Sequence, residues 1–216
     1  MSACSLVECW DLDDTILRTM KFVSLVCGFV AEHSSRSPEQ VLATFEQVRQ
    51  ELFSPQAWFE KLDLEPSERS ALQEKLTKHV QGEARDLLYP GIREFLEERQ
   101  ALGVRLVLIT SGDIGYQVWK FSLLGLENLF QIQDRHCVSP KADKSDCIRP
   151  YLREARVTLI DDNQKWLELV RRALTGVRRI RVAWPEGKHH ALSASDFNHW
   201  HSAVNVHQLR ELLADS

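Results

Sequence analysis

Three acidic residues, Asp11, Asp13 and Asp14, stand close together within residues 6–17, which read LVECWDLDDTIL. Asp11 and Asp13 are two positions apart, so in an extended chain their side chains point to the same face. Carboxylates this close repel each other and raise each other's pKa. A bound cation would offset that repulsion, and an ionised carboxylate beside a metal-held phosphate can attack phosphorus to form an aspartyl-phosphate. The acids therefore predict a cation site suited to phosphoryl transfer.

Two later apolar runs also end in residues that could belong to such a site. The runs at 104–109 (VRLVLI) and 156–160 (RVTLI) consist mainly of apolar residues, as expected of buried strands that are covered on both faces. The polar residues that follow these runs are Thr110, Ser111, Gly112 and Asp113 after the first, and Asp161 and Asp162 after the second. Because ligands of an open parallel sheet bind beyond the carboxyl ends of its strands, we expect all these residues to face one crevice.

Mg²⁺ is the cation that best suits these side chains. It prefers oxygen ligands and usually keeps several waters, so a few carboxylates and a phosphate oxygen would satisfy it. A phosphate also needs hydrogen-bond donors, which the Thr110 hydroxyl, the backbone amides of Ser111 and Gly112, and a lysine could supply. A second carboxyl that stays protonated could donate a proton to the leaving oxygen and later activate water.

The region between the first strand and residue 88 has almost no strand signal and reads as a succession of helices. Ser37 and Pro38 have the positions of an N-cap and of the first helical residue, and apolar residues follow at helical spacing. The stretches at 19–33 and 65–80 have the same character. Three or four helices in succession predict a separate all-helical domain over 18–87, inserted after the first strand.

Strand and helix signals alternate from residue 90 onward. Helices are expected near 90–103, 112–125, 163–176 and 205–215, and strands at 104–109, 156–160 and 177–184. Such alternation predicts a parallel sheet with helices on both faces, to which residues 6–10 add one more strand. The expected fold class is therefore α/β, with a Rossmann-like doubly wound core made of residues 1–17 and 88–216.

The composition argues against several kinds of partner. The chain has 27 basic and 31 acidic side chains, a formal net charge of −4 and no basic block, so we expect neither nucleic acid nor an anionic membrane as partner. No apolar run reaches the roughly 20 residues that span a bilayer, and no signal peptide is apparent. Five cysteines without a CxxC pair are typical of reduced thiols, which predicts a cytoplasmic protein.

Four motifs in order resemble the haloacid dehalogenase superfamily of hydrolases. They are DLDDT at 11–15, LVLIT at 106–110, a lysine within SPKADKSDCI at 139–148, and VTLIDD at 157–162. In that family the corresponding motifs are DxDxT after a strand, a strand ending in Thr or Ser, a lysine near a helix start, and a strand ending in acids. The resemblance covers the whole chain, and the inserted helices resemble the family's C1-type cap.

The resemblance implies roles for the four acids. Asp11 would be the nucleophile, and Asp13 would be the general acid/base. The Asp11 carboxylate, the main-chain carbonyl of Asp13 and the Asp162 carboxylate would bind Mg²⁺. Asp161, which stands where many members have glycine, is a further candidate ligand.

The resemblance also implies which residues hold the phosphate. Thr110 would bind it and take part in catalysis, together with Ser111 and Gly112. The lysine motif leaves two candidates for a second catalytic and phosphate-binding group. We favour Lys144 because it opens a helix, and Lys141 is the alternative.

The function expected from this resemblance is that of a Mg²⁺-dependent phosphatase acting on a small phosphorylated metabolite, with the cap closing over the site. A phosphomutase would use the same chemistry but return the phosphoryl group to its substrate. A haloacid dehalogenase would keep Asp11, but it needs neither metal nor an acid at position 13. A catalytically silent binding module should have lost one of the acids, and none is lost. The substrate and the oligomeric state stay open.

Overall fold

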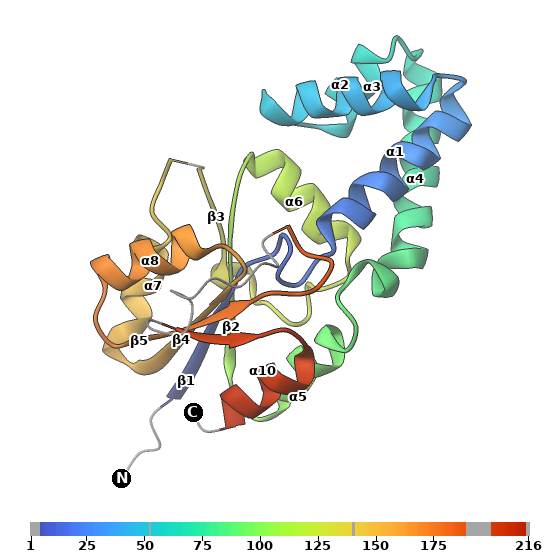
Figure 1. The fold of residues 1–216 in the computed structure, drawn as a ribbon. Coiled ribbons are helices and arrows are strands. Elements are labelled where there is room, and N and C mark those ends of the chain that lie inside the picture. Colours follow the sequence, from blue (N-terminus) through green and yellow to red (C-terminus); the bar gives the residue numbers. More distant parts are fainter. Residues whose placement is uncertain (1–4, 52, 140, 189–199, 215–216) are drawn as a thin grey trace.

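The computed structural model describes residues 5–51, 53–139, 141–188 and 200–214, and its centre is a six-stranded sheet (Figure 1). The strand order is β3-β2-β1-β4-β5-β6, and every neighbouring pair is parallel. The strands are β1 (Ser5–Trp10), β2 (Arg105–Ser111), β3 (Arg135–Val138), β4 (Ala155–Asp161), β5 (Val177–Val182) and β6 (His201–Ala203). The sequence predicts β1, β2, β4 and β5, but it does not predict the short edge strands β3 and β6.

Helices cover both faces of the sheet, which confirms the predicted doubly wound α/β fold. One face carries α5 (Ile92–Ala101), α6 (Ile114–Leu123) and α10 (Val206–Ala214), and the other carries α7 (Ser145–Ile148) and α8 (Gln164–Ala173). Short 3-10 turns at Ile132–Asp134 and Arg149–Arg153 precede β3 and β4. Side chains alternate along β1, so Trp10 packs under the first group of helices and Cys9 under the second. None of the helices in the described part of the chain is long and apolar enough to cross a membrane.

Between β1 and α5 the described part of the chain forms four helices that lie together beyond one end of the sheet (Figure 1). They are α1 (Thr19–Ser34), α2 (Pro38–Gln50), α3 (Pro55–Lys61) and α4 (Pro66–Leu87), and we call them the helical insertion. The start of α2 is as predicted, because the Ser37 side chain accepts a hydrogen bond from the Gln40 amide at 3.2 Å. That residues 18–87 act as a cap domain stays a prediction.

Aromatic packing joins the helical insertion to α6. Phe53, in the segment between α2 and α3, packs against Tyr116 and Trp119, with ring centroids 4.9 and 5.0 Å apart. Phe22 of α1 reaches the same Trp119 ring at 5.6 Å. Gly115 allows this close approach, because a Cβ there would lie 2.3 Å from the Phe53 carbonyl oxygen.

The two connections between the sheet and the helical insertion run side by side. The Arg18 amide donates to the Leu87 carbonyl at 2.9 Å, and the Tyr89 amide donates to the Ile16 carbonyl at 3.1 Å. The helical insertion therefore leaves the sheet and rejoins it at one place.

The register of the sheet sets the positions of its acidic strand ends. Trp10 pairs with Ile160 of β4, so the next residues, Asp11 and Asp161, lie at the same level of neighbouring strands. The Asp11 amide donates to the Ile160 carbonyl at 3.0 Å and continues the ladder. Asp11 lies two residues after Cys9, and Asp161 lies two residues after Leu159, the partner of Cys9. Both acids therefore point to the same face as these two residues, which is the face covered by α7 and α8.

Candidate active site

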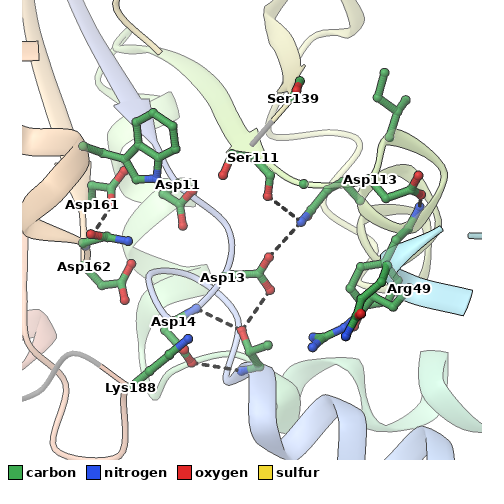
Figure 2. A pocket seen from close by; sticks show the side chains of 18 of the residues that line it. Asp11, Asp13, Asp14, Arg49, Ser111, Asp113, Ser139, Asp161, Asp162 and Lys188 are labelled. Atoms are coloured by element: carbon green, nitrogen blue, oxygen red, sulfur yellow. Dashed lines mark hydrogen bonds between the residues drawn. The ribbon is translucent and has the colours of Figure 1, made fainter. Parts of the chain in front are cut away.

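A cavity of about 740 Å³ opens at the carboxyl ends of the strands (Figure 2). The strand ends contribute Asp11, Ser111 and Asp161 to its lining, and the helical insertion contributes Arg49. Figure 2 shows Asp11 and Asp161 together on one side of the cavity and Arg49 on the other. The three strand ends that the sequence directs to one crevice therefore do meet in one cavity.

Lys144 joins Asp11 to the acid at the end of β4. Its fully buried ammonium donates to Asp11 Oδ1 at 2.6 Å and to Asp161 Oδ2 at 2.7 Å. Lys144 directly precedes α7, as the sequence predicts for a lysine that opens a helix. Lys141, the other candidate, is exposed. Of these two lysines, the structure brings Lys144 to the acids.

Burial controls the charge of these acids. It raises the pKa of Asp11 to about 7; the Lys144 charge opposes this shift and the Asp161 charge adds to it. Burial also raises the pKa of Asp162 to about 9, and the charges of Asp161 and Asp11 add to this shift. One buried lysine therefore does not offset three close carboxylates.

The acids have the chemistry of a Mg²⁺ site. Carboxylate oxygens of Asp11, Asp161 and Asp162 lie within 4.8 Å of one another, and hard oxygen donors of this kind suit Mg²⁺. A divalent cation would offset the charge that Lys144 leaves unbalanced. Both oxygens of Asp161 already accept hydrogen bonds, from Lys144 and from the Asn163 amide. Asp162 is therefore better placed than Asp161 to offer an oxygen to the ion.

Thr15, the last residue of the DLDDT motif, holds the backbone of Asp162 in place. Its hydroxyl accepts a hydrogen bond from the Asp162 amide at 3.0 Å, and its carbonyl accepts one from the Trp184 indole at 2.9 Å. Thr15 is fully buried. It thus ties the loop after β1 to the end of β4, a role that the motif spacing alone does not predict.

The structure places Ser111, and not Thr110, on the side of the sheet that carries Asp11. The buried Thr110 hydroxyl donates to Gln117 Oε1 at 3.0 Å, and Thr110 is not among the residues that line the cavity. Trp10 pairs with Leu108, and side chains alternate between the two faces of the sheet along each strand. The Ser111 side chain therefore points to the same face as that of Asp11, and the Thr110 side chain points to the opposite face. The phosphate-binding role predicted for Thr110 does not fit this geometry, because its side chain points to the wrong face.

Gly112 lines the cavity, but its amide is already engaged. It donates to the Val138 carbonyl at 3.0 Å and so joins the end of β2 to β3. The donor role predicted for this amide therefore does not hold in this structure. The position favours glycine for another reason, since a Cβ there would lie 2.8 Å from Gln117 Nε2.

Asp13 is held by three side chains that the sequence motifs do not include. Lys120 contacts both of its carboxylate oxygens, and Gln117 Nε2 donates to Oδ2 at 3.0 Å. The Thr19 hydroxyl donates to Oδ1 at 2.9 Å. Burial acts to raise the pKa of Asp13, but the Lys120 charge and these hydrogen bonds outweigh burial and lower the pKa. The Asp13 carboxylate is therefore ionised in this arrangement.

A family model agrees with the motifs. The model for haloacid dehalogenase-like hydrolases matches residues 9–173, which contain the acids of β1, the whole helical insertion and the acids that end β4. The chain therefore belongs to the haloacid dehalogenase-like hydrolase family, as the resemblance implied. No curated protein sequence matches the chain.

Solved structures share this fold at low sequence identity. A candidate haloacid dehalogenase-like hydrolase of Burkholderia xenovorans is 18% identical over 99% of this chain and 98% of its own, with a TM-score of 0.62. A protein of Haemophilus somnus, named as a predicted phosphoglycolate phosphatase, is 14% identical over 98% and 100%, with a TM-score of 0.53. A candidate β-phosphoglucomutase of Thermotoga maritima is 16% identical over 97% and 99%, also with a TM-score of 0.53. At these identities the likeness shows the fold alone.

Proposed function

We propose that this protein is a Mg²⁺-dependent phosphatase that hydrolyses a small phosphorylated metabolite through an aspartyl-phosphate on Asp11. The observation that carries the proposal is the Asp11 carboxylate, which faces a cavity, pairs with buried Lys144 and lies beside Asp162. The cavity of about 740 Å³ has the size of a small-molecule site. Membership of the haloacid dehalogenase-like hydrolases supports hydrolysis as the reaction.

In the proposed first step, a carboxylate oxygen of Asp11 attacks the phosphorus of the bound monoester. A bond forms between Asp11 and phosphorus, and the bond from phosphorus to the leaving oxygen breaks. Asp13 gives its proton to that oxygen. The negative charge of the substrate phosphate would raise the pKa of Asp13, because a like charge disfavours the ionised form, and this supports a protonated Asp13 in the complex.

In the proposed second step, ionised Asp13 takes a proton from a water molecule. The water oxygen attacks the phosphorus of the aspartyl-phosphate, and the bond between phosphorus and Asp11 breaks. Inorganic phosphate leaves, and both acids return to the states they had in the substrate complex, with Asp11 ionised and Asp13 protonated. The ion pair between Asp13 and Lys120 supports this step, because it favours the basic form of Asp13.

Asp11, Asp162 and the main-chain carbonyl of Asp13 would hold Mg²⁺, with Asp161 as a further acid of the group. When bound, the ion supplies positive charge that offsets the repulsion between the phosphate and these acids. The proposed donor from β2 is the Ser111 hydroxyl, in place of Thr110.

Lys144 has a proposed role at the nucleophile. Its ammonium favours the ionised, attacking form of Asp11. The Lys144 side chain is fully buried and is not among the residues that line the cavity. Direct contact with a phosphate would therefore require its ammonium to leave Asp161, so the proposed role of Lys144 is to hold the Asp11 carboxylate.

A phosphomutase is the alternative that the same residues support. It differs only in the acceptor, which is a substrate hydroxyl instead of water. A haloacid dehalogenase needs no acid at position 13, whereas Lys120 and Gln117 both hold the Asp13 carboxylate here. This arrangement favours a phosphatase or a mutase over a dehalogenase.

We also propose that residues 18–87 form a cap that helps to choose the substrate. Arg49, Gln50 and Glu51, at the end of α2, line the same cavity as Asp11 and so support this role. The free thiols of the described cysteines support a reducing, cytoplasmic location; these cysteines are Cys9, Cys27, Cys137 and Cys147.

The test is phosphate release from an aryl phosphate by wild type and Asp11→Asn, each with Mg²⁺ and with chelator. Release should require Mg²⁺ and should be lost in Asp11→Asn, while exposed Asp146→Asn serves as the matched control and keeps wild-type activity. Retained activity in Asp11→Asn would overturn the nucleophile assignment. Transfer of phosphate to added sugar phosphates, instead of its release, would favour the mutase.

A further inference from the structure

We propose that Lys120 and Gln117 are positioning residues, which fix the Asp13 carboxylate beside Asp11 so that it can exchange protons with the leaving oxygen and with water. Both belong to α6 and are three residues apart, so they lie on one face of that helix. The inference deepens the proposed function and rests on it, because it assigns partners to the proposed general acid/base.

The Lys120 side chain is fully buried, which is unfavourable for an ammonium group unless a partner carries the opposite charge. Within the described part of the chain, Asp13 is the carboxylate in ion-pair contact with it, through both oxygens. The centroid of the Tyr116 ring lies 4.6 Å from the ammonium nitrogen, and the ring shields the ammonium further. Lys120 therefore constrains both the place and the orientation of the Asp13 carboxylate.

Gln117 constrains the same carboxylate from a second direction. Its Nε2 donates to Asp13 Oδ2 and to the Ser111 carbonyl, each at 3.0 Å. Both partners are acceptors, so the amide nitrogen must face them, and Oε1 is left to accept the Thr110 hydroxyl at 3.0 Å. The amide thus has one satisfactory orientation. The buried Thr110, which does not reach the cavity, acts here as the support of Gln117.

The backbone after β2 makes room for this arrangement. Gly112 has a φ of +147°, and a Cβ there would lie 2.8 Å from Gln117 Nε2. A side chain at this position would push the amide away from Asp13. The absence of a side chain at Gly112, which was predicted to bind phosphate, therefore leaves the space through which the Gln117 side chain reaches Asp13.

Lys120 acts on the reaction through Asp13. Asp13 and Gln117 are among the residues that line the cavity, and Lys120 is not. A bound phosphate would meet the Asp13 carboxylate first, with the ammonium behind it. We therefore expect loss of Lys120 to impair proton transfer more than substrate binding.

The experiment compares two esters, because a general acid matters most when the leaving group is poor. An aryl phosphate releases a stable phenolate, whereas an alkyl phosphate needs a proton on its leaving oxygen. Lys120→Met should lower kcat/KM for the alkyl ester by about 10²-fold and for the aryl ester by less than about 10-fold. Asp13→Asn should show the same preference, and adding Lys120→Met to it should cause little further loss.

Several outcomes would decide against the inference. An equal loss on both esters, or a full additional loss in the Asp13→Asn background, would show that Lys120 serves the fold and not Asp13. Arg99→Met is the matched control, because Arg99 pairs with buried Glu8 away from the cavity. It should lower the melting temperature without changing the ratio of kcat/KM values for the two esters.

If Lys120→Met does not fold, Gln117→Met carries the same comparison with a smaller change in charge. It should also affect the alkyl ester more than the aryl ester. A wild-type protein that releases phosphate from neither ester would overturn the proposed function, and the inference with it. A wild-type protein that is active, but whose Lys120 and Gln117 variants show no ester preference, would overturn the inference alone.

Discussion

Lys144 and Asp161 form an ion pair in which both side chains are fully buried, with Nζ and Oδ2 2.7 Å apart. The same ammonium lies 2.6 Å from Asp11 Oδ1. Burial of a charged pair contributes little net stability, but removal of one partner leaves an unpaired buried charge. The stability of the core and the charge of the proposed nucleophile therefore depend on the same lysine.

Replacing Lys144 with methionine should lower the free energy of unfolding by about 3–5 kcal/mol, because two buried carboxylates lose their cation. It should also lower kcat by at least about 10²-fold. Lys141→Met, at the exposed alternative position, should change the free energy of unfolding by less than about 0.5 kcal/mol. Urea unfolding and steady-state kinetics measure both effects, and equal behaviour of the two variants would contradict the assignment of Lys144.

The stability of the metal-free protein should depend on pH through the protonation of Asp162. Its pKa rises from an ordinary 3.8 to about 9 in the folded chain, mainly through burial. Between these values the unfolded state loses the proton first, so the contribution of Asp162 to stability is present at low pH and is lost as the pH rises. In chelator, the melting temperature of wild type should therefore fall relative to that of Asp162→Asn between about pH 5 and about pH 8.

Mg²⁺ should reverse this trend, because in the proposed site the ion would bind the ionised Asp162 carboxylate and so stabilise the folded state. Added Mg²⁺ should raise the melting temperature of wild type more at about pH 8 than at about pH 6, and should do so less in Asp162→Asn. Parallel melting curves for the two proteins at every pH, with and without Mg²⁺, would count against Asp162 as a ligand.

Gly115→Ala should loosen the contact between α6 and the helical insertion. A Cβ at position 115 would lie 2.3 Å from the Phe53 carbonyl oxygen, so we expect the free energy of unfolding to fall by about 1–3 kcal/mol. Gly82→Ala is the matched control in α4, where nothing lies within 4 Å of the added atom. It should raise the free energy of unfolding by about 0.5–1 kcal/mol, as usual for alanine in a helix. Similar stabilisation by both substitutions would contradict the close approach at Phe53.

Local patterns account for the parts of the fold that the sequence predicts correctly. The apolar run of β2 and the Ser37-Pro38 start of α2 are signals contained within a few residues. The edge strands β3 and β6 have four and three residues, too few for a recognisable pattern of side chains. They become strands because neighbouring strands offer them hydrogen-bond partners, and this depends on the whole sheet.

The same distinction applies to the site. Asp11, Asp161 and Asp162 could be predicted to meet because parallel strands bring their carboxyl ends to one edge. It could not be predicted that Ser111 and not Thr110 faces the cavity, since this depends on the register between β1 and β2. Lys120 reads in the sequence as an ordinary polar position of a helix, and only the packing of α6 over the sheet brings it to Asp13.

The hydrogen bonds Arg18–Leu87 and Tyr89–Ile16, which hold the two ends of the helical insertion together, bear on how the insertion can change in evolution. The entropy lost on closing a loop grows only with the logarithm of its length, at about 0.6 kcal/mol for each doubling. Since the sheet itself holds the two ends together, the helices between them can lengthen, shrink or be exchanged at small thermodynamic cost. Under the proposed cap role, the part of the gene that encodes residues 18–87 could thus change the substrate preference while the rest goes on encoding the same acids.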